Sequence, residues 1–317
     1  MMIAKIIGVV YLMTAAWSAA FAQASGPRVE LSLIVKDKEN QSISTLRKED
    51  VRVFEDGVEQ TILSIETDER PVDLGIAIDA SGSFRKFLGA GVMIAKSIID
   101  TRRSDDQTFI ERFIDTPKIQ RVQDFTSNKN LLQQAVDKLY VEGGQSAIVD
   151  AIYTAVNYVA EHNKADPGKR KAVLIITDGE DRNSSYKAEK LIDLLRRQQV
   201  QVFVIGFTLD LDERSSSTKV SSREKAEKLL KSIAEESGGR AFFPRDEKQL
   251  MNAILQCGSD LAKQFRVTYQ SSSPNSNVDP KKTFRQIEVK VTSPDGEKRT
   301  GIAPRGYSVE ANPSEKK

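Results

Sequence analysis

Three oxygen-bearing side chains follow one another on a short stretch of this sequence. The stretch reads LGIAIDASGSF, from Leu74 to Phe84, and places Asp79, Ser81 and Ser83 at alternating positions directly after an apolar run. Carboxylate and hydroxyl oxygens in such a row could stabilise a turn, bind a phosphate or hold a metal ion. The residues elsewhere in the chain must distinguish these possibilities.

Two further motifs supply matching oxygen atoms. EGGQSAIVDA places Ser146 after a Gly-Gly turn at the start of a predicted helix, and AVLIITDGED ends a predicted strand on Asp178. The carboxyl ends of strands form the functional crevice of an open α/β sheet, so Asp79 and Asp178 should meet there. Two carboxylates and three hydroxyls, with no histidine or thiol, suit Mg²⁺, Mn²⁺ or Ca²⁺ rather than zinc or copper. The candidate metal ligands are therefore Asp79, Ser81, Ser83, Ser146 and Asp178.

The elements that must position these residues follow one another from residue 71 to residue 264. Continuous Val/Ile runs such as VDLGIAID and KAVLIITD alternate with segments of helical periodicity such as AIVDAIYTAVNYVAEH. Strands covered on both faces that alternate with helices predict a doubly wound, mostly parallel sheet of the α/β class. PKIQRVQDF directly follows another strand pattern, so we expect it to be an antiparallel edge strand.

The flanks of this core have a different pattern. VELSLIVKD and VRVFEDGVEQTILSIET precede it, FRVTYQ, FRQIEVKVTS and RTGIAPRGYSVE follow it, and all of them read as strands. We expect the two flanks to pack together as a small β-sandwich. The predicted organisation is a signal peptide (1–22), an N-terminal β segment (23–70), the α/β domain (71–264), a C-terminal β segment (265–310) and a disordered tail (311–317).

The N-terminus predicts export. Lys5 precedes an apolar run that ends in Ala20-Phe21-Ala22, which is the pattern of a signal peptide cleaved after Ala22. A retained membrane anchor is the alternative, but the run is short for a span. The mature protein would then be periplasmic, secreted or on the cell surface, with no membrane span.

Composition restricts the functions further. The 47 basic and 45 acidic residues give a net charge of +2, so no strong field favours nucleic acid as a partner. Cys257 is the only cysteine, which rules out an intramolecular disulfide, and it lies on a helical pattern expected to bury it. His162 is the only histidine and is expected on the surface, so catalysis that needs several histidines is excluded.

The motifs DASGS, GGQS and TDGED, in this order and on these elements, resemble the von Willebrand factor type A domain with its metal-ion-dependent adhesion site. The resemblance implies a Rossmann-like fold in which Ser81 and Ser83 bind the cation directly, while Asp79 acts through water and orients its loop. Asp178 would lie further out when a partner is bound. Ser146 stands where the family usually has threonine; it keeps the hydroxyl but lacks the methyl group that restrains the rotamer.

The flanks are similar to those of bacterial exported proteins with a von Willebrand factor type A-related domain. The family resemblance implies a non-enzymatic adhesion module that captures an acidic side chain of a partner protein through the cation, most simply Mg²⁺. It also implies that ligand binding could shift the last core helix, residues 246–264.

Two other functions compete with this interpretation. A hydrated divalent cation beside carboxylates could serve a hydrolase or a phosphotransferase. Against this, no Gly-x-Ser-x-Gly motif surrounds Ser81 or Ser83, and the single histidine leaves no Ser-His-Asp triad. Alternatively, the metal could be purely structural and hold the loops together.

Residues around the motifs are expected to have supporting roles. Asp150, one helical turn after Ser146, should make capping hydrogen bonds or hydrogen bonds that support the metal ligands, and is not expected to bind metal itself. Glu180 and Asp181 should form a solvated rim. Phe84 and Phe87 should pack against the helix that follows.

Overall fold

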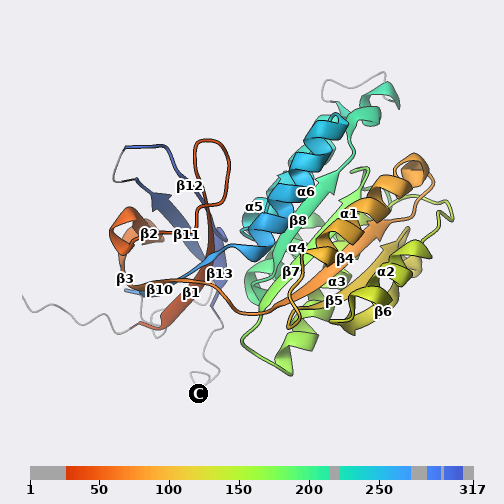
Figure 1. The fold of residues 1–317 in the computed structure, drawn as a ribbon. Coiled ribbons are helices and arrows are strands. Elements are labelled where there is room, and N and C mark those ends of the chain that lie inside the picture. Colours follow the sequence, from red (N-terminus) through yellow and green to blue (C-terminus); the bar gives the residue numbers. More distant parts are fainter. Residues whose placement is uncertain (1–25, 215–220, 273–283, 294–295, 310–317) are drawn as a thin grey trace, which may run out of the picture.

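A computed structural model describes residues 26–214, 221–272, 284–293 and 296–309 of the chain. These residues form two parts: an α/β core and, beside it, an antiparallel sheet built from both flanks (Figure 1). The predicted signal peptide and the predicted disordered tail lie outside the described residues. Among the described residues, no helix is long and apolar enough to span a bilayer.

The core sheet is six-stranded, in the order β6-β5-β4-β7-β8-β9. Its strands are β4 (Val72–Asp79), β5 (Gln107–Phe113), β6 (Gln120–Thr126), β7 (Arg170–Thr177), β8 (Gln201–Gly206) and β9 (Ala241–Phe242). Neighbouring strands run parallel except β6, which pairs antiparallel with β5 at one edge. The predicted α/β class and the predicted antiparallel edge strand are therefore confirmed. The central strands β4 and β7 are buried on both faces, which explains their unbroken apolar sequences.

Six helices cover this sheet in the described part of the chain (Figure 1). Their bounds are α1 (Leu88–Asp100), α2 (Lys129–Asp137), α3 (Ile148–Lys164), α4 (Ala188–Gln198), α5 (Ser222–Glu236) and α6 (Glu247–Ala262). Apolar residues of α1, α2 and α6 pack on one face, with the thiol of Cys257 buried among them. Apolar residues of α3, α4 and α5 pack on the other face. Side chains that alternate along each strand thus contribute to two separate cores.

The flanks form one seven-stranded sheet in the order β12-β1-β10-β3-β2-β11-β13. The strands are β1 (Arg28–Lys36), β2 (Val51–Glu55), β3 (Val58–Thr67), β10 (Phe265–Gln270), β11 (Phe284–Val291), β12 (Thr300–Ile302) and β13 (Gly306–Ser308). The sequence correctly predicts that the two flanks pair. We expected two stacked sheets, as in a sandwich. The described strands instead share one hydrogen-bonded sheet.

This sheet curls, so that one sheet can enclose the apolar core that two stacked sheets would enclose in a sandwich. Residues 300–308 pair with β1 through β12 and with β11 through β13, so the two ends of the sheet approach each other. The inward side chains enclose a separate apolar core that includes Leu33, Val53 and Val267. Inside this core the carboxylate of Glu55 accepts hydrogen bonds from the hydroxyls of Tyr269 and Ser271, both at 2.7 Å.

A buried ion pair joins the two parts. Lys36 at the end of β1 contacts Asp260 on α6, and both side chains are almost completely buried. Arg240 donates to the other oxygen of Asp260 at 2.8 Å. Burial lowers the pKa of Lys36, and the carboxylate of Asp260 offsets part of this effect. These contacts tie α6 to the flank sheet; the predicted shift of this helix on ligand binding stays a prediction.

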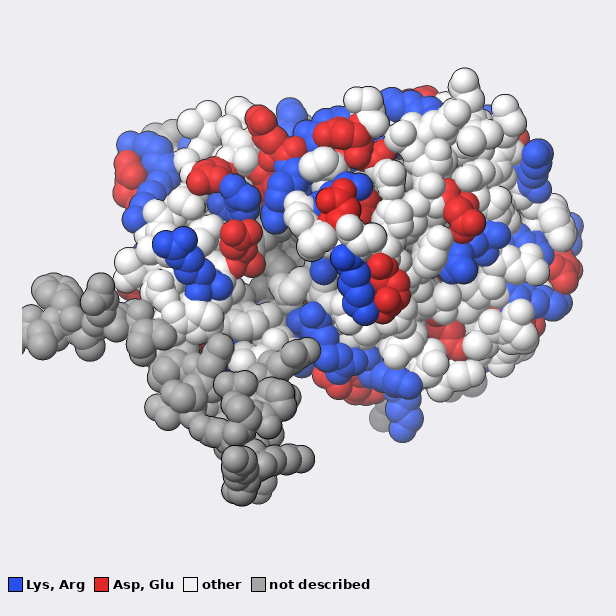
Figure 2. Space-filling model, turned by 90° about the horizontal axis from the view of Figure 1, so that it is seen from below, with Lys and Arg blue, Asp and Glu red and all other residues white. Residues whose placement is uncertain are grey.

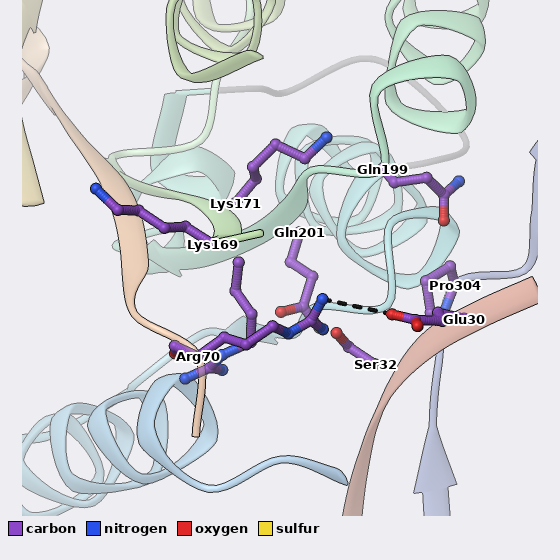
Figure 3. Close-up of a pocket in the computed structure, with 9 residues that line it drawn as sticks. Glu30, Ser32, Arg70, Lys169, Lys171, Gln199, Gln201 and Pro304 are labelled. Atoms are coloured by element: carbon purple, nitrogen blue, oxygen red, sulfur yellow. Dashed lines mark hydrogen bonds and ion pairs between the residues drawn. The ribbon is translucent and has the colours of Figure 1, made fainter. Parts of the chain in front are cut away.

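A polar cavity of about 130 Å³ also lies between the two parts (Figure 3). Arg70 reaches across it toward Glu30, with 3.6 Å between the charged groups, whereas Lys169 and Lys171 point away from this pair. Lys171 donates to the carbonyl of Gln198 at the C-terminal end of α4, where a cation is favourable. The basic side chains around this cavity therefore contact a helix end and nearby carboxylates. Figure 2 shows basic and acidic side chains mixed in the same way on one face of the molecule.

Candidate metal centre

Asp79, the last residue of β4, is the centre of the candidate site. Its side chain is completely buried. One carboxylate oxygen, Oδ1, accepts a hydrogen bond from the amide of Ser81 at 2.8 Å. The other, Oδ2, accepts hydrogen bonds from Ser146 Oγ at 3.0 Å and from Thr177 Oγ1 at 2.7 Å. A single carboxylate thus joins the three loops that carry the predicted ligands.

Ser81 and Ser83 stand beside each other on the loop after β4. Their hydroxyl oxygens are 3.2 Å apart, with Ser81 buried and Ser83 half-buried at the start of a short 3-10 helix (Ser83–Lys86). Neighbouring ligands of an octahedral cation with metal–oxygen distances of 2.0–2.1 Å are separated by roughly 3 Å. The two hydroxyls are therefore spaced as adjacent ligands of one small cation would be.

The Gly-Gly turn brings Ser146 to the same place. Gly143 and Gly144 both have φ of +101°, and a Cβ atom on Gly144 would lie 2.7 Å from Ile114, so this turn needs glycine. The amide of Glu142 donates to the carbonyl of Ala80 at 3.2 Å, which holds this loop against the loop that carries the two serines. Ser146 itself is buried.

Asp178 follows β7 and is also buried. Burial raises the pKa of Asp79 to about 6, and the negative charge of Asp178 is the second cause of that increase. Gly179 follows with φ of +93°, and a Cβ atom there would lie 2.8 Å from Thr208. The structure thus brings all five predicted residues to one edge of the sheet, where two buried carboxylates repel each other and a cation would relieve that repulsion.

The donor set fits a hard cation. Among the described residues, no group of three or more His, Cys, Asp or Glu side chains is placed to hold a metal ion. A cation at this edge would consequently depend on the serine hydroxyls as well as on Asp79 and Asp178. Oxygen donors of this kind suit Mg²⁺, Mn²⁺ or Ca²⁺.

One supporting residue of the site, Thr177, could not be singled out from the sequence, and Asp150 and Asp181 make other contacts than expected. Thr177 binds Asp79 and also accepts the amide of Gly179 at 3.1 Å. Asp150 does not cap α3; its carboxylate accepts the amides of Ser185 and Tyr186 in the loop after β7, both at 2.8 Å. Asp181 was expected in a solvated rim; it is half-buried, and its carboxylate also accepts amides at the start of α3. Thr177 directly precedes Asp178 in the sequence, but the direction of its hydroxyl depends on the tertiary structure.

Thr177→Val is expected to destabilise the protein by about 2 kcal/mol, because the methyl group that replaces the hydroxyl leaves Asp79 and a buried amide without their partner. Thr177→Ser keeps the hydroxyl and should cost clearly less. Urea unfolding of both variants measures the difference. Equal stability of the two variants would contradict this role of the hydroxyl.

Comparison with known proteins gives one family and several distant structures. The family model described as von Willebrand factor type A domain matches residues 73–256. No curated protein matches the chain.

Solved structures that match the chain include a conserved hypothetical protein BatB from Bacteroides thetaiotaomicron, with 16% identity over 60% of this chain and 98% of that chain and a TM-score of 0.46. Proximal thread matrix protein 1 from the mussel byssus, with a zinc-occupied MIDAS motif, has 20% identity over 65% of this chain and 49% of its own, with a TM-score of 0.45. A von Willebrand factor type A protein from Catenulispora acidiphila has 14% identity over 89% and 74% of the two chains, with a TM-score of 0.44.

Proposed function

This chain belongs to the von Willebrand factor type A domain family, and from that premise we propose that it is an exported, non-enzymatic binding module. A divalent cation held by Asp79, Ser81, Ser83, Ser146 and Asp178 would capture an acidic side chain of a partner protein. Domains of this family are protein-interaction modules, and their metal-ion-dependent adhesion sites bind divalent cations.

The observation that carries this proposal is the meeting of three loops at Asp79. The carboxylate accepts hydrogen bonds from the loop of Ser81, from Ser146 and from the end of β7 next to Asp178. The serine hydroxyls and the two carboxylates would hold the cation, most simply Mg²⁺. When bound, such a cation supplies an open coordination position that a carboxylate of the partner can occupy.

A hydrolase or phosphotransferase is the second candidate, and the position of the histidine argues against the triad form. His162 contacts Gln107 at the start of β5 and stacks on Phe125, whereas the candidate site lies at the carboxyl end of the sheet. The histidine expected to be solvated is thus partly buried, at the opposite end of the sheet. Turnover of phosphate or ester substrates that disappears in Asp79→Asn would reverse the ranking of the two functions.

Export is part of the proposal and rests on the N-terminal sequence. The charged start, the apolar run and the Ala20-Phe21-Ala22 pattern favour cleavage after Ala22. N-terminal sequencing of the protein isolated from the cell envelope tests it. A mature chain that begins at Gln23 supports export, and an intact N-terminus rejects cleavage.

The experiment that tests partner capture uses the mature chain, from Gln23 onward, immobilised and exposed to cell-envelope proteins. We expect a partner to be retained with Mg²⁺, released by chelator and displaced by an excess of a small dicarboxylate. If the amount of retained protein does not change with Mg²⁺, chelator or dicarboxylate, a carboxylate bridged by metal is rejected. Metal binding without any retained partner would favour the purely structural role of the cation.

A further inference from the structure

The helix that carries Ser146 at its entrance lacks a cap of its own. Its N-cap residue is Ala147, which has no side-chain acceptor for the first amides of α3. Asp150 in the first turn does not replace it, because its carboxylate accepts the amides of Ser185 and Tyr186. The start of this helix must therefore be stabilised from another part of the chain.

Asp181 supplies the missing cap from the loop after β7. Its Oδ1 atom accepts the amide of Ile148 at 2.8 Å and the amide of Val149 at 3.3 Å. Ser184 donates its hydroxyl to the same oxygen at 2.5 Å, which fixes the carboxylate. A negative charge is also favourable at the N-terminus of a helix. The cap is thus provided by the loop that carries Asp178.

Backbone contacts extend this connection to Ser146 itself. The amides of Arg182 and Asn183 donate to the carbonyl of Ser146 at 2.9 and 3.1 Å. Further along, the amide of Asp150 donates to Ser184 Oγ at 3.2 Å. Residues 181–186 are thereby attached to the first turn of α3 at several points. The backbone position of Ser146 depends on this attachment.

We propose that Asp181 is a positioning residue for the metal centre, which holds Ser146 at the site by capping α3 from the Asp178 loop. The inference rests on the proposed metal binding. Serine lacks the methyl group that would restrain its rotamer, so the position of its backbone has to be well fixed for its hydroxyl to reach a cation. Without the cap, two amides at the start of α3 lose their acceptor and the turn that carries Ser146 loosens. Groups that orient metal ligands in this way commonly change affinity by about 10–100-fold.

Calorimetric titration with Mn²⁺ tests this assignment on the mature chain. Asp181→Ala is expected to bind Mn²⁺ at least about 10-fold more weakly than the wild type. Asp181→Asn keeps an oxygen acceptor and should retain most of the affinity. Asn128→Ala is the matched control, because Asn128 caps α2 by accepting the amides of Asn130 at 3.0 Å and Leu131 at 3.3 Å and lies in another helix. This control should lose stability but bind Mn²⁺ normally.

Hydrogen exchange at the amides of Ile148 and Val149 shows whether the cap has been removed, and we expect it to accelerate in Asp181→Ala. Faster exchange with unchanged Mn²⁺ affinity would overturn the assignment. If Asp181→Ala does not fold, Asp181→Glu displaces the carboxylate by one methylene and should weaken Mn²⁺ binding by roughly 3-fold; unchanged binding would again overturn it. A wild-type chain that binds no Mn²⁺ would reject the proposed metal site itself, before any variant is compared.

Discussion

Asp79→Asn is expected to abolish divalent cation binding, with a loss of affinity of at least about 100-fold. Replacing residues that only orient the ligands of a metal commonly lowers metal affinity by about 10–100-fold. Asp79 is hydrogen-bonded to all three loops of the site, so its replacement should have a larger effect. An asparagine would replace one acceptor oxygen by an NH₂ group that faces the hydroxyl donors Ser146 and Thr177 or the amide of Ser81. The loops would then lose their common partner as well as a negative charge.

Asp73→Asn provides a matched control on the same strand. Asp73 lies near the start of β4, is completely buried and accepts a hydrogen bond from Asn163 at 3.2 Å. Asp79 lies six positions further along the strand, roughly 20 Å away. Titration of both variants with Mn²⁺ should show lost binding for Asp79→Asn and unchanged affinity for Asp73→Asn. Equal affinities in the two variants would contradict a metal site at the end of β4.

The ends of the strands explain why the sequence could predict that the five candidate ligands lie at one edge of the sheet. Asp79 and Asp178 directly follow buried strands, and strands that run parallel must deliver their ends to one edge. The Gly-Gly turn before Ser146 is likewise visible in the sequence, because positive φ at consecutive positions favours glycine. Local patterns therefore sufficed to bring these candidate residues together.

The supporting residues could not be predicted in the same way. Asp181 caps a helix that begins 33 positions earlier in the chain, and no local pattern links it to Ile148. The pairing of β12 with β1 and of β13 with β11 similarly depends on the path of residues 300–308 across the flank sheet. The cap and the strand pairing both depend on contacts between segments that are distant in the sequence. The spacing of residue types along the chain does not predict such contacts.

A buried carboxylate outside the metal centre has the largest expected effect on stability. Glu111 lies in the middle of β5, only 1% exposed, opposite Ala77 on β4 and Arg121 on β6. Both of its carboxylate oxygens are buried without a hydrogen-bond partner among the described residues. Burial raises the pKa of Glu111 to about 8, and the nearby charge of Arg121 offsets only part of this increase. The native protein therefore keeps a proton on Glu111 at neutral pH.

The free energy of unfolding should consequently fall as the pH rises. Below about pH 4.5 both the native and the unfolded state hold this proton, so the stability that depends on it is fully present. Between pH 4.5 and 8 the unfolded state releases the proton and the native state does not, so the native state loses stability progressively. The total loss corresponds to roughly 3–5 kcal/mol, complete once the pH exceeds the pKa in the native state.

Glu111→Gln should remove this dependence, because the amide cannot ionise and has nearly the same shape. At pH 5 the variant and the wild type should have similar free energies of unfolding, and at pH 8 the variant should be the more stable protein by several kcal/mol. Urea unfolding at pH 5, 6.5 and 8 measures the difference, and Glu161→Gln, an exposed glutamate on α3, is the control that should change little at any pH. A difference between Glu111→Gln and wild type that stays constant from pH 5 to 8 would mean that the carboxyl group is solvated or paired in the native protein. A growing difference would show that the stability of β5 depends on the proton on Glu111, independently of the candidate metal centre.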